Sequence, residues 1–253
     1  MDIISKKGEE LRQRAITAAV IIALVLVVGL IDNIYLTGLV IGVIAFLGFL
    51  EAKELFGVND DKIVYILLSS IFLSLVTTPL AAGVFAVIVT ASYVAYYQKD
   101  VSLISPMLYP FLPLMALYAL YLKTSMGHVG WLIVVVALTD TFAYFVGKNF
   151  GKKFFDRGFC PTSPNKSIEG IVGGVFIATV IGAFVGLYYT SFLHAFFISL
   201  VVSVSSVFGD LFESYLKRRA GVKDSGDLLP GHGGILDRID GYLFAGPVMF
   251  VLF

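Results

Sequence analysis

Apolar stretches recur along almost the whole chain and are separated by short polar segments. A membrane-spanning helix needs about 20 mostly apolar residues, so each stretch predicts a helix that crosses most or all of a bilayer. The predicted spans are 15–31, 34–50, 63–78, 80–97, 106–122, 128–146, 168–189, 193–215 and 241–253. The last is short for a crossing, which indicates either a half-helix packed in the bundle or an incomplete span. The pattern predicts an all-α, polytopic integral membrane protein with about nine transmembrane helices in one domain, residues 1–253.

Prolines sharpen two of these boundaries. Pro79 separates the third and fourth predicted spans, and it suits a helix start because its missing N–H is not needed there. Pro110 and Pro113 fall in the first turns of the fifth span and predict a bend there.

Composition agrees with a membrane protein and excludes an ordinary soluble domain. The 253 residues are 58% hydrophobic and 14% charged, against roughly 25% charged in soluble domains, and the mean hydropathy is +0.91. The single cysteine, Cys160, excludes an intramolecular disulfide and is interpreted as an incidental thiol. No nucleic acid is expected among the partners.

The basic residues predict the orientation, because Lys and Arg in short loops stay in the cytoplasm. With the N-terminus inside, 17 of the 18 Lys and Arg residues fall on the cytoplasmic side, and only Lys123 falls outside. We therefore expect a protein of the cell (inner) membrane. Its polar loops, about 148–167 and 217–240, would face the cytoplasm and carry the active site.

One polar stretch, Ser214 to Asp240, contrasts with the rest of the chain. It holds five basic residues, four acids, a Pro-Gly turn and a His-Gly-Gly sequence. Glycines allow a backbone to approach an anion closely, and Asp237 and Asp240 would share a helical face. The stretch predicts a site for phosphate and a metal ion. The alternative is a charged loop that only joins two membrane helices.

Acidic residues also lie within or near the ends of predicted spans. Asp210, Glu213, Ser214 and Lys217 have the spacing of one helical face, and ionisable groups within a span usually face the protein interior or a watery cavity. Asp210 is thus expected to point at the polar site. Alternatively, Asp210 or Glu213 pairs with a basic residue along the helix. Asp140 either lines the cavity or satisfies nearby hydroxyl groups.

The second polar loop contains the sequence SPNKSIEG, residues 163–170. Ser163 and Asn165 favour a turn, Ser167 can cap the next helix, and Glu169 lies in that helix's first turn. We expect Lys166 to help bind a substrate phosphate. The alternative is a capped helix start with a basic anchor at the membrane surface.

These residues carry a resemblance to a known family. Its signature is matched in order and spacing by Ser214, Lys217, Arg218, Lys223, Asp224, Leu228, His232, Gly233, Gly234, Asp237, Arg238 and Asp240. The family is that of the phosphatidate cytidylyltransferases, or CDP-diacylglycerol synthases. SPNKSIEG and the preceding DTFAYFVGKNFGKK also resemble family segments. The first five spans are similar only as a hydrophobic pattern, and the short C-terminal end departs from the family.

The resemblance implies that CTP and phosphatidic acid react with the help of Mg²⁺ to form CDP-diacylglycerol and pyrophosphate. Whether one or two cations bind remains open. It implies catalytic roles for Asp210, Asp237, Asp240, Lys217 and Arg218, with the three aspartates as metal ligands. Implied substrate-binding residues are Ser163, Asn165, Lys166, Ser214, Lys223, Asp224, His232, Gly233, Gly234 and Arg238. Membrane lipid is then a partner, and a homodimer remains open.

Two other functions compete with this interpretation. Intramembrane acids also mark the pathways of ion-coupled transporters, although the chain shows no internal repeat and its acids cluster near the cytoplasmic ends of the spans. A phosphotransferase that joins CDP-diacylglycerol to an alcohol would release CMP, and the paired Asp, Gly and Ala-Arg spacing of that family is not found.

Overall fold

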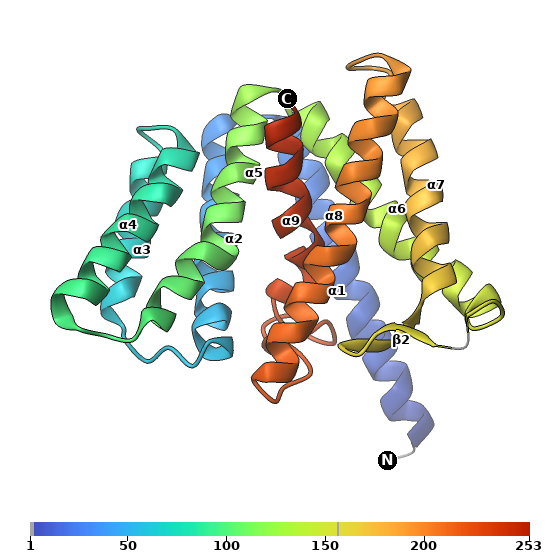
Figure 1. The fold of residues 1–253 in the computed structure, drawn as a ribbon, viewed down its shortest axis with the longest axis horizontal. Coiled ribbons are helices and arrows are strands. Elements are labelled where there is room, and N and C mark those ends of the chain that lie inside the picture. Colours follow the sequence, from blue (N-terminus) through green and yellow to red (C-terminus); the bar gives the residue numbers. More distant parts are fainter. Residues whose placement is uncertain (1–2, 156) are drawn as a thin grey trace. The chain divides into compact units, whose positions relative to one another are not determined.

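The computed structural model describes residues 3–155 and 157–253, with side chains from residue 12 onward. Lys6 and Lys7, used in the orientation argument, therefore lie outside the described side chains. Helices make up most of the described chain (Figure 1). The α-helices are α1 (Ile3–Ile31), α2 (Ile34–Leu55), α3 (Lys62–Ser74), α4 (Pro79–Tyr97), α5 (Leu112–Lys123), α6 (Met126–Phe150), α7 (Ile168–Gly186), α8 (Phe192–Arg219) and α9 (Leu236–Leu252). The predicted all-α fold class is confirmed.

Seven helical segments of the described chain are long and apolar enough to cross a membrane. One of them, Val101–Lys123, combines the short helix η1 (Val101–Ile104), the π-helical turn η2 (Met107–Phe111) and α5. The chain is an integral membrane protein. Two helices are shorter, α3 with 13 residues and α9 with 17. At 1.5 Å per residue, α3 rises about 20 Å, against a hydrocarbon core of about 30 Å.

The predicted third span, 63–78, is longer than the helix that the structure shows. The helix ends at Ser74, and Thr78 has extended backbone angles of φ −71° and ψ 131°. The following proline disfavours a helical conformation at Thr78. Pro79 itself starts α4, as predicted. The bend predicted in the fifth span is also present, because Tyr109, next to Pro110, leaves the helical conformation.

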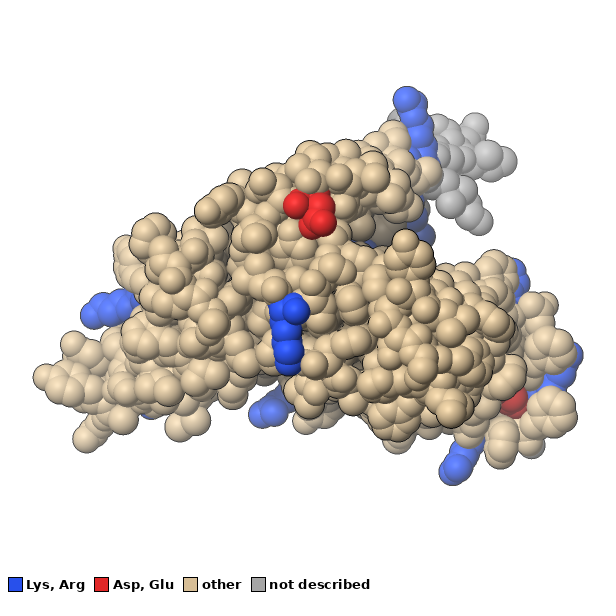
Figure 2. Space-filling view, turned by 90° about the horizontal axis from the view of Figure 1, so that it is seen from above, with Lys and Arg blue, Asp and Glu red and all other residues tan. Residues whose placement is uncertain are grey.

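The surface has the character expected of a protein surrounded by lipid. Large apolar side chains are exposed on the helices, for example Leu30 at 84% and Leu193 at 80%. On the face shown in Figure 2, Lys, Arg, Asp and Glu are few and scattered. Exposed apolar patches of this extent mark a membrane environment.

By its internal contacts the chain divides into two compact units. Unit 1 comprises Met1–Leu112 and Val222–Arg238. In it, α3 packs on α4, and α2 packs on η2. The buried side chains include Phe49, Ile63 and Phe111. The loop before α9 and the first residues of α9 belong to this unit, which therefore contains the His-Gly-Gly sequence.

Unit 2 comprises Pro113–Gly221 and Ile239–Phe253. The helices α6, α7 and α8 pack closely together in it (Figure 1). Trp131, Leu132 and Ile198 lie in its hydrophobic core. A Cβ atom at Gly174 would lie 2.7 Å from the Thr139 carbonyl oxygen, so the small residue is needed for close contact of α6 and α7. The single catalytic domain expected from the sequence remains a prediction.

The polar loops differ in detail from the sequence prediction. Helix α6 continues to Phe150 and α8 to Arg219, so the loops are shorter than 148–167 and 217–240.

Within the first loop, the strands β1 (Gly158–Cys160) and β2 (Ser163–Ser167) pair antiparallel. The turn predicted at Ser163 and Asn165 is wrong. These residues form a strand because the β1 backbone pairs with theirs, and the chain reverses between the strands, where Pro161 suits a turn.

Candidate active site

The polar stretch from Ser214 to Asp240 is divided between several local structures. Ser214, Lys217 and Arg218 lie on the last turns of α8, in unit 2. Lys223 and Asp224 are exposed in the loop that follows, in unit 1. The final acids are helical, as expected. Asp237 and Asp240 lie three residues apart on α9, so their side chains project from one face of that helix.

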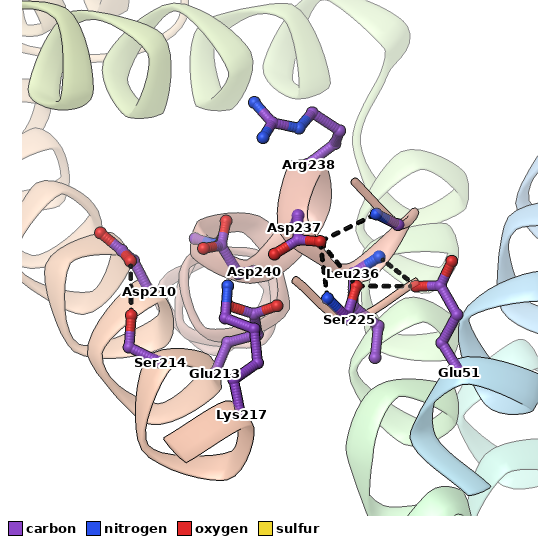
Figure 3. A network of polar contacts seen from close by, with 12 residues as sticks. Glu51, Asp210, Glu213, Ser214, Lys217, Ser225, Leu236, Asp237, Arg238 and Asp240 are labelled. Carbon is purple, nitrogen blue, oxygen red and sulfur yellow. Dashed lines mark hydrogen bonds and ion pairs between the residues drawn. The ribbon is translucent and has the colours of Figure 1, made fainter. Parts of the chain in front are cut away.

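The carboxylate of Asp237 organises the loop before α9. Its Oδ2 accepts hydrogen bonds from the Ser225 N–H at 2.8 Å, the Ser225 hydroxyl at 2.9 Å and the Gly234 N–H at 2.8 Å (Figure 3). Hydrogen bonds to a charged acceptor are roughly twice as strong as neutral ones. Asp237 therefore has a structural role besides the metal-binding role predicted for it, which stays a prediction.

The glycines of the loop are required by its geometry. Gly231 and Gly233 have φ values of +73° and +77°, a region that side chains disfavour. The turn is closed by hydrogen bonds from the Leu229 N–H to the Gly233 carbonyl and from the His232 N–H to the Leu229 carbonyl. At Gly234, a Cβ atom would lie 2.2 Å from the Ser225 Oγ. The glycine-rich sequence thus serves the fold of the loop as well as any ligand.

His232 and Arg238 lie together on this loop and the adjoining helix. The Arg238 Nε donates a hydrogen bond to the His232 carbonyl at 3.1 Å, and the Arg238 side chain is otherwise exposed. The Nδ1 atom of His232 is buried and has no hydrogen-bond partner among the described residues. Buried polar atoms are usually paired, so this nitrogen is a candidate contact for a ligand.

Glu51, on α2, was not among the candidates from the sequence. It is 9% exposed and accepts hydrogen bonds from the Ser225 hydroxyl and from the backbone N–H groups of Ile235 and Leu236. The signal was an acid at the end of an apolar run, in EAKEL, which looks like the ordinary polar end of a span.

In unit 2, a cavity of about 400 Å³ lies between α6, α7, β2 and α8. Its lining includes Asp140, Tyr144, Lys148, Asn165, Lys166 and Asp210. The Lys166 ammonium forms an ion pair with Asp210 across it, and Asp210 also lies 3.4 Å from the Ser214 hydroxyl. Asp210 and Asp140 thus line one polar cavity. That Asp210 shares a site with Asp237 and Asp240 stays a prediction.

Lys166 is surrounded by more than one carboxylate. Burial lowers the pKa of Lys166 below its usual range, the carboxylates of Asp140 and Asp240 oppose this shift, and the Lys217 ammonium adds to it. The side chain is nevertheless 37% exposed, so water still reaches it. The ammonium thus provides one positive charge to a group of acids from α6, α8 and α9.

Glu213 and Lys217 form an ion pair along α8, one turn apart (Figure 3). This confirms the helix-pairing alternative for Glu213, whose side chain is fully buried. Asp210 does not follow that alternative, because it forms an ion pair with Lys166 of β2. Arg218 is exposed on the last turn of the helix.

The loop between α6 and α7 is held by the residues that the sequence singled out. The Ser167 Oγ accepts a hydrogen bond from the Gly170 N–H and caps α7, as predicted. The Glu169 carboxylate accepts hydrogen bonds from the backbone N–H groups of Lys152, Phe154 and Phe155. Lys166 is thereby attached to a well-defined hairpin beside the cavity. Ser163 and Asn165 lie on the same strand.

The carboxylates of unit 2 are suitable ligands for a divalent cation. A cluster that already surrounds an ammonium group supplies the carboxylate oxygens that Mg²⁺ prefers. In the described part of the chain, no three His, Cys, Asp or Glu side chains come close enough to hold a metal ion by themselves. Mg²⁺ usually takes one or two carboxylates and completes its shell with water and substrate phosphates, so the residues present fit it.

Comparison with known protein sequences shows the family of the chain. Residues 12–253 match the sequence model of the cytidylyltransferase family. A phosphatidate cytidylyltransferase of Helicobacter pylori is 41% identical over 238 residues, which cover 92% of this chain and 88% of that protein. A phosphatidate cytidylyltransferase of Thermotoga maritima is 33% identical over 271 residues, covering 97% of each chain. The chain belongs to the cytidylyltransferase family.

Proposed function

We propose that this chain is a phosphatidate cytidylyltransferase, which converts CTP and phosphatidic acid into CDP-diacylglycerol and pyrophosphate in phospholipid biosynthesis. The observation that carries the proposal is the similarity to two proteins of that name over nearly the whole length of each chain. The cavity lined by Lys166 and Asp210 adds support, because its charges suit phosphate and a cation.

The reaction is a displacement at phosphorus. A phosphate oxygen of phosphatidic acid attacks the α-phosphorus of CTP and forms a new P–O bond. The bond from the α-phosphorus to the oxygen shared with the β-phosphorus breaks, and pyrophosphate leaves with the electron pair. Because the attacking oxygen is already an anion, the protein needs no strong general base. Its main tasks are to neutralise and align two polyanions.

The residues of unit 2 suit these tasks. The Lys166 ammonium lies within electrostatic reach of Lys217, Asp140 and Asp240, and Lys217 lies within reach of Asp240. Both ammonium groups would offset the charge of the substrate phosphates. The sequence predicts Asp210, Asp237 and Asp240 as ligands of Mg²⁺. Because no three such side chains come together in the described part of the chain, we propose that one or two of these aspartates hold the ion and that substrate phosphates and water complete its shell. Bound Mg²⁺ would stabilise negative charge on the phosphates and on the leaving pyrophosphate.

We further propose that the loop of unit 1 holds a phosphate or the nucleotide. The buried Nδ1 of His232 and the exposed side chains of Lys223 and Arg238 support this role. The glycine turn adds backbone N–H groups, which bind anions well. These groups are neutral or positively charged, as a site for a triphosphate requires.

The proposed reaction is tested with purified protein, phosphatidic acid, CTP labelled in the cytosine ring, and Mg²⁺. We expect the label to enter the lipid phase and pyrophosphate to appear in equal amount, and neither to occur when phosphatidic acid is omitted. Addition of EDTA should stop the reaction until Mg²⁺ or Mn²⁺ is restored. Label that stays in the water phase with folded protein would refute the proposal. CMP release in a separate reaction with added CDP-diacylglycerol and an alcohol would indicate the alcohol phosphotransferase instead.

We also propose that the protein lies in the inner membrane with its N-terminus and active site in the cytoplasm. The basic-residue count supports this orientation. After removal of Cys160, single cysteines at the exposed positions Lys123 and Ser191 should react with an impermeant thiol reagent added outside, and those at Lys153 and Asp227 should not. The reverse labelling would place the site away from cytoplasmic CTP.

A further inference from the structure

Glu51 is a buried carboxylate that accepts hydrogen bonds from neutral donors of one distant loop. Its Oε1 accepts the Ile235 N–H at 2.8 Å, and its Oε2 accepts the Leu236 N–H at 2.9 Å and the Ser225 hydroxyl at 3.0 Å (Figure 3). These partners lie 174 to 185 residues further along the chain. A buried charge is costly unless it is well hydrogen-bonded, so these contacts form a specific arrangement.

The backbone donors lie at the start of α9: Ile235 directly precedes the helix, and Leu236 is its first residue. At a helix start these groups have no partner within the helix, and a carboxylate is favourable there because the helix dipole is positive at that end. Glu51 therefore acts as a cap that reaches α9 from another helix. It fixes the beginning of the helix that bears Asp237 and Asp240.

Ser225 connects Glu51 with Asp237. Its hydroxyl oxygen lies 3.0 Å from the Glu51 Oε2 and 2.9 Å from the Asp237 Oδ2, and its single hydrogen can serve one of them at a time. The orientation of the Asp237 carboxylate thus depends on a group that Glu51 also holds.

The loop is shaped to receive the Glu51 side chain. A Cβ atom at Gly234 would lie 2.4 Å from the Glu51 Oε2, and one at Gly226 would lie 2.9 Å from the Oε1. Real Cβ contacts are not this short, so any side chain at either position would displace the carboxylate. Two glycines of the loop are therefore explained by Glu51 rather than by a ligand.

We propose that Glu51 is a positioning residue for the signature loop of unit 1: from α2 it holds Ser225 and the start of α9, and so sets the direction of Asp237. This inference rests on the proposed function, since it concerns the same site. Glu51 acts through Ser225 and the backbone, so its loss should affect turnover and the Mg²⁺ requirement rather than the affinity for lipid.

The variant Glu51→Gln tests the proposal with a small change. Both oxygens of Glu51 face donors. In glutamine one oxygen becomes an NH₂ group, which then faces a donor in either orientation of the amide. The matched control is Glu54→Gln, the same change one turn further along α2 at an exposed position.

Two measurements are made on each variant. Supporting groups behind metal ligands typically contribute about 10–100-fold to activity or metal affinity. We therefore expect Glu51→Gln to lower kcat by about that factor and to raise the Mg²⁺ concentration for half-maximal rate, with the KM for phosphatidic acid unchanged. Hydrogen–deuterium exchange should be faster at Ile235 and Leu236. Glu54→Gln should match the wild type in both measurements.

The outcomes separate the inference from the proposed function. Faster exchange in Glu51→Gln with unchanged kinetics would make Glu51 a purely structural cap, and unchanged exchange would refute its contact with α9. If the wild type itself formed no CDP-diacylglycerol, the proposed function would fail, and with it the catalytic part of this inference. Should Glu51→Gln not fold, Ser225→Ala removes the shared hydroxyl alone. This variant should also raise the Mg²⁺ concentration for half-maximal rate, and an unchanged concentration would refute the link to Asp237.

Discussion

Replacing Lys166 by glutamine tests the electrostatics of the cavity in unit 2. Lys166→Gln removes one positive charge and keeps a polar side chain of similar length, whereas Lys166→Arg keeps the charge and serves as the control. We expect Lys166→Gln to lower the maximal rate, because the substrate phosphates lose a cation. We also expect it to bind Mg²⁺ more tightly, because the ammonium no longer repels the ion from Asp210.

The size of the second effect follows from Coulomb's law. Two unit charges 4 Å apart interact by about 1 kcal/mol in bulk water, so an ammonium and a divalent cation would repel each other by about 2 kcal/mol. The Lys166 side chain is partly buried, with 37% exposed, so the value for water is the lower limit of this repulsion. Since 1.4 kcal/mol is a factor of ten, removal of the charge strengthens Mg²⁺ binding by about 30-fold or more.

The assay measures turnover and thermal unfolding over a range of Mg²⁺ concentrations at constant ionic strength. In Lys166→Gln the half-maximal Mg²⁺ concentration should fall for both quantities while the maximal rate drops, and Lys166→Arg should stay near the wild type. An unchanged or higher half-maximal concentration in Lys166→Gln would show that the cation binds elsewhere. The carboxylates around Lys166 would then serve only the lysine.

The two acids of α9 should respond differently to substitution. Asp237→Asn weakens three hydrogen bonds to the loop and should cost about 1–3 kcal/mol of stability in addition to activity. Asp240→Asn should abolish turnover with an unchanged melting temperature. Equal melting temperatures of the two variants would contradict the structural role of Asp237. A pH effect is expected at Asp60: burial alone would raise its pKa, but hydrogen bonds from the Lys62 N–H, the Tyr93 hydroxyl and Lys99 lower it. Its stabilisation is therefore present above the unfolded pKa of about 3.9 and is lost as the pH falls through the lower folded value. Thermal melts between pH 5 and pH 3 should decline less steeply in Asp60→Asn than in the wild type.

Features that depend on neighbouring residues were predictable from the sequence. The apolar runs predicted the long helices, Pro79 marked the start of α4, and Ser167 was recognised as the cap of α7. Each of these follows from length, from backbone geometry or from a side chain that reaches three residues ahead. Helical spacing likewise pointed to the cavity residue Asp210, since it lies on the same helical face as Ser214 and Lys217.

Features that depend on distant contacts were not predictable. The hairpin that contains Ser163 and Asn165 forms because a second segment pairs with it, and a pairing partner leaves no periodic pattern in strands of three and five residues. Glu51 was overlooked for the same reason. Its partners are more than 170 residues away, so spacing rules, which describe one helix or one strand, contain no information about it.

The acidic residues of this protein therefore fall into groups according to the partner that each carboxylate binds, and the type of partner indicates whether the role is structural or functional. Glu51 and Glu169 accept hydrogen bonds from backbone N–H groups, which cannot move away without unfolding a loop, so these carboxylates are committed to structure. Asp210 instead holds the ammonium of Lys166, at the end of a flexible side chain that can exchange one charged partner for another. Asp237 has a backbone partner, although it belongs to the family signature. A cation bound by Asp237 would therefore be coupled to the order of the loop, whereas one bound by Asp210 would compete with a lysine.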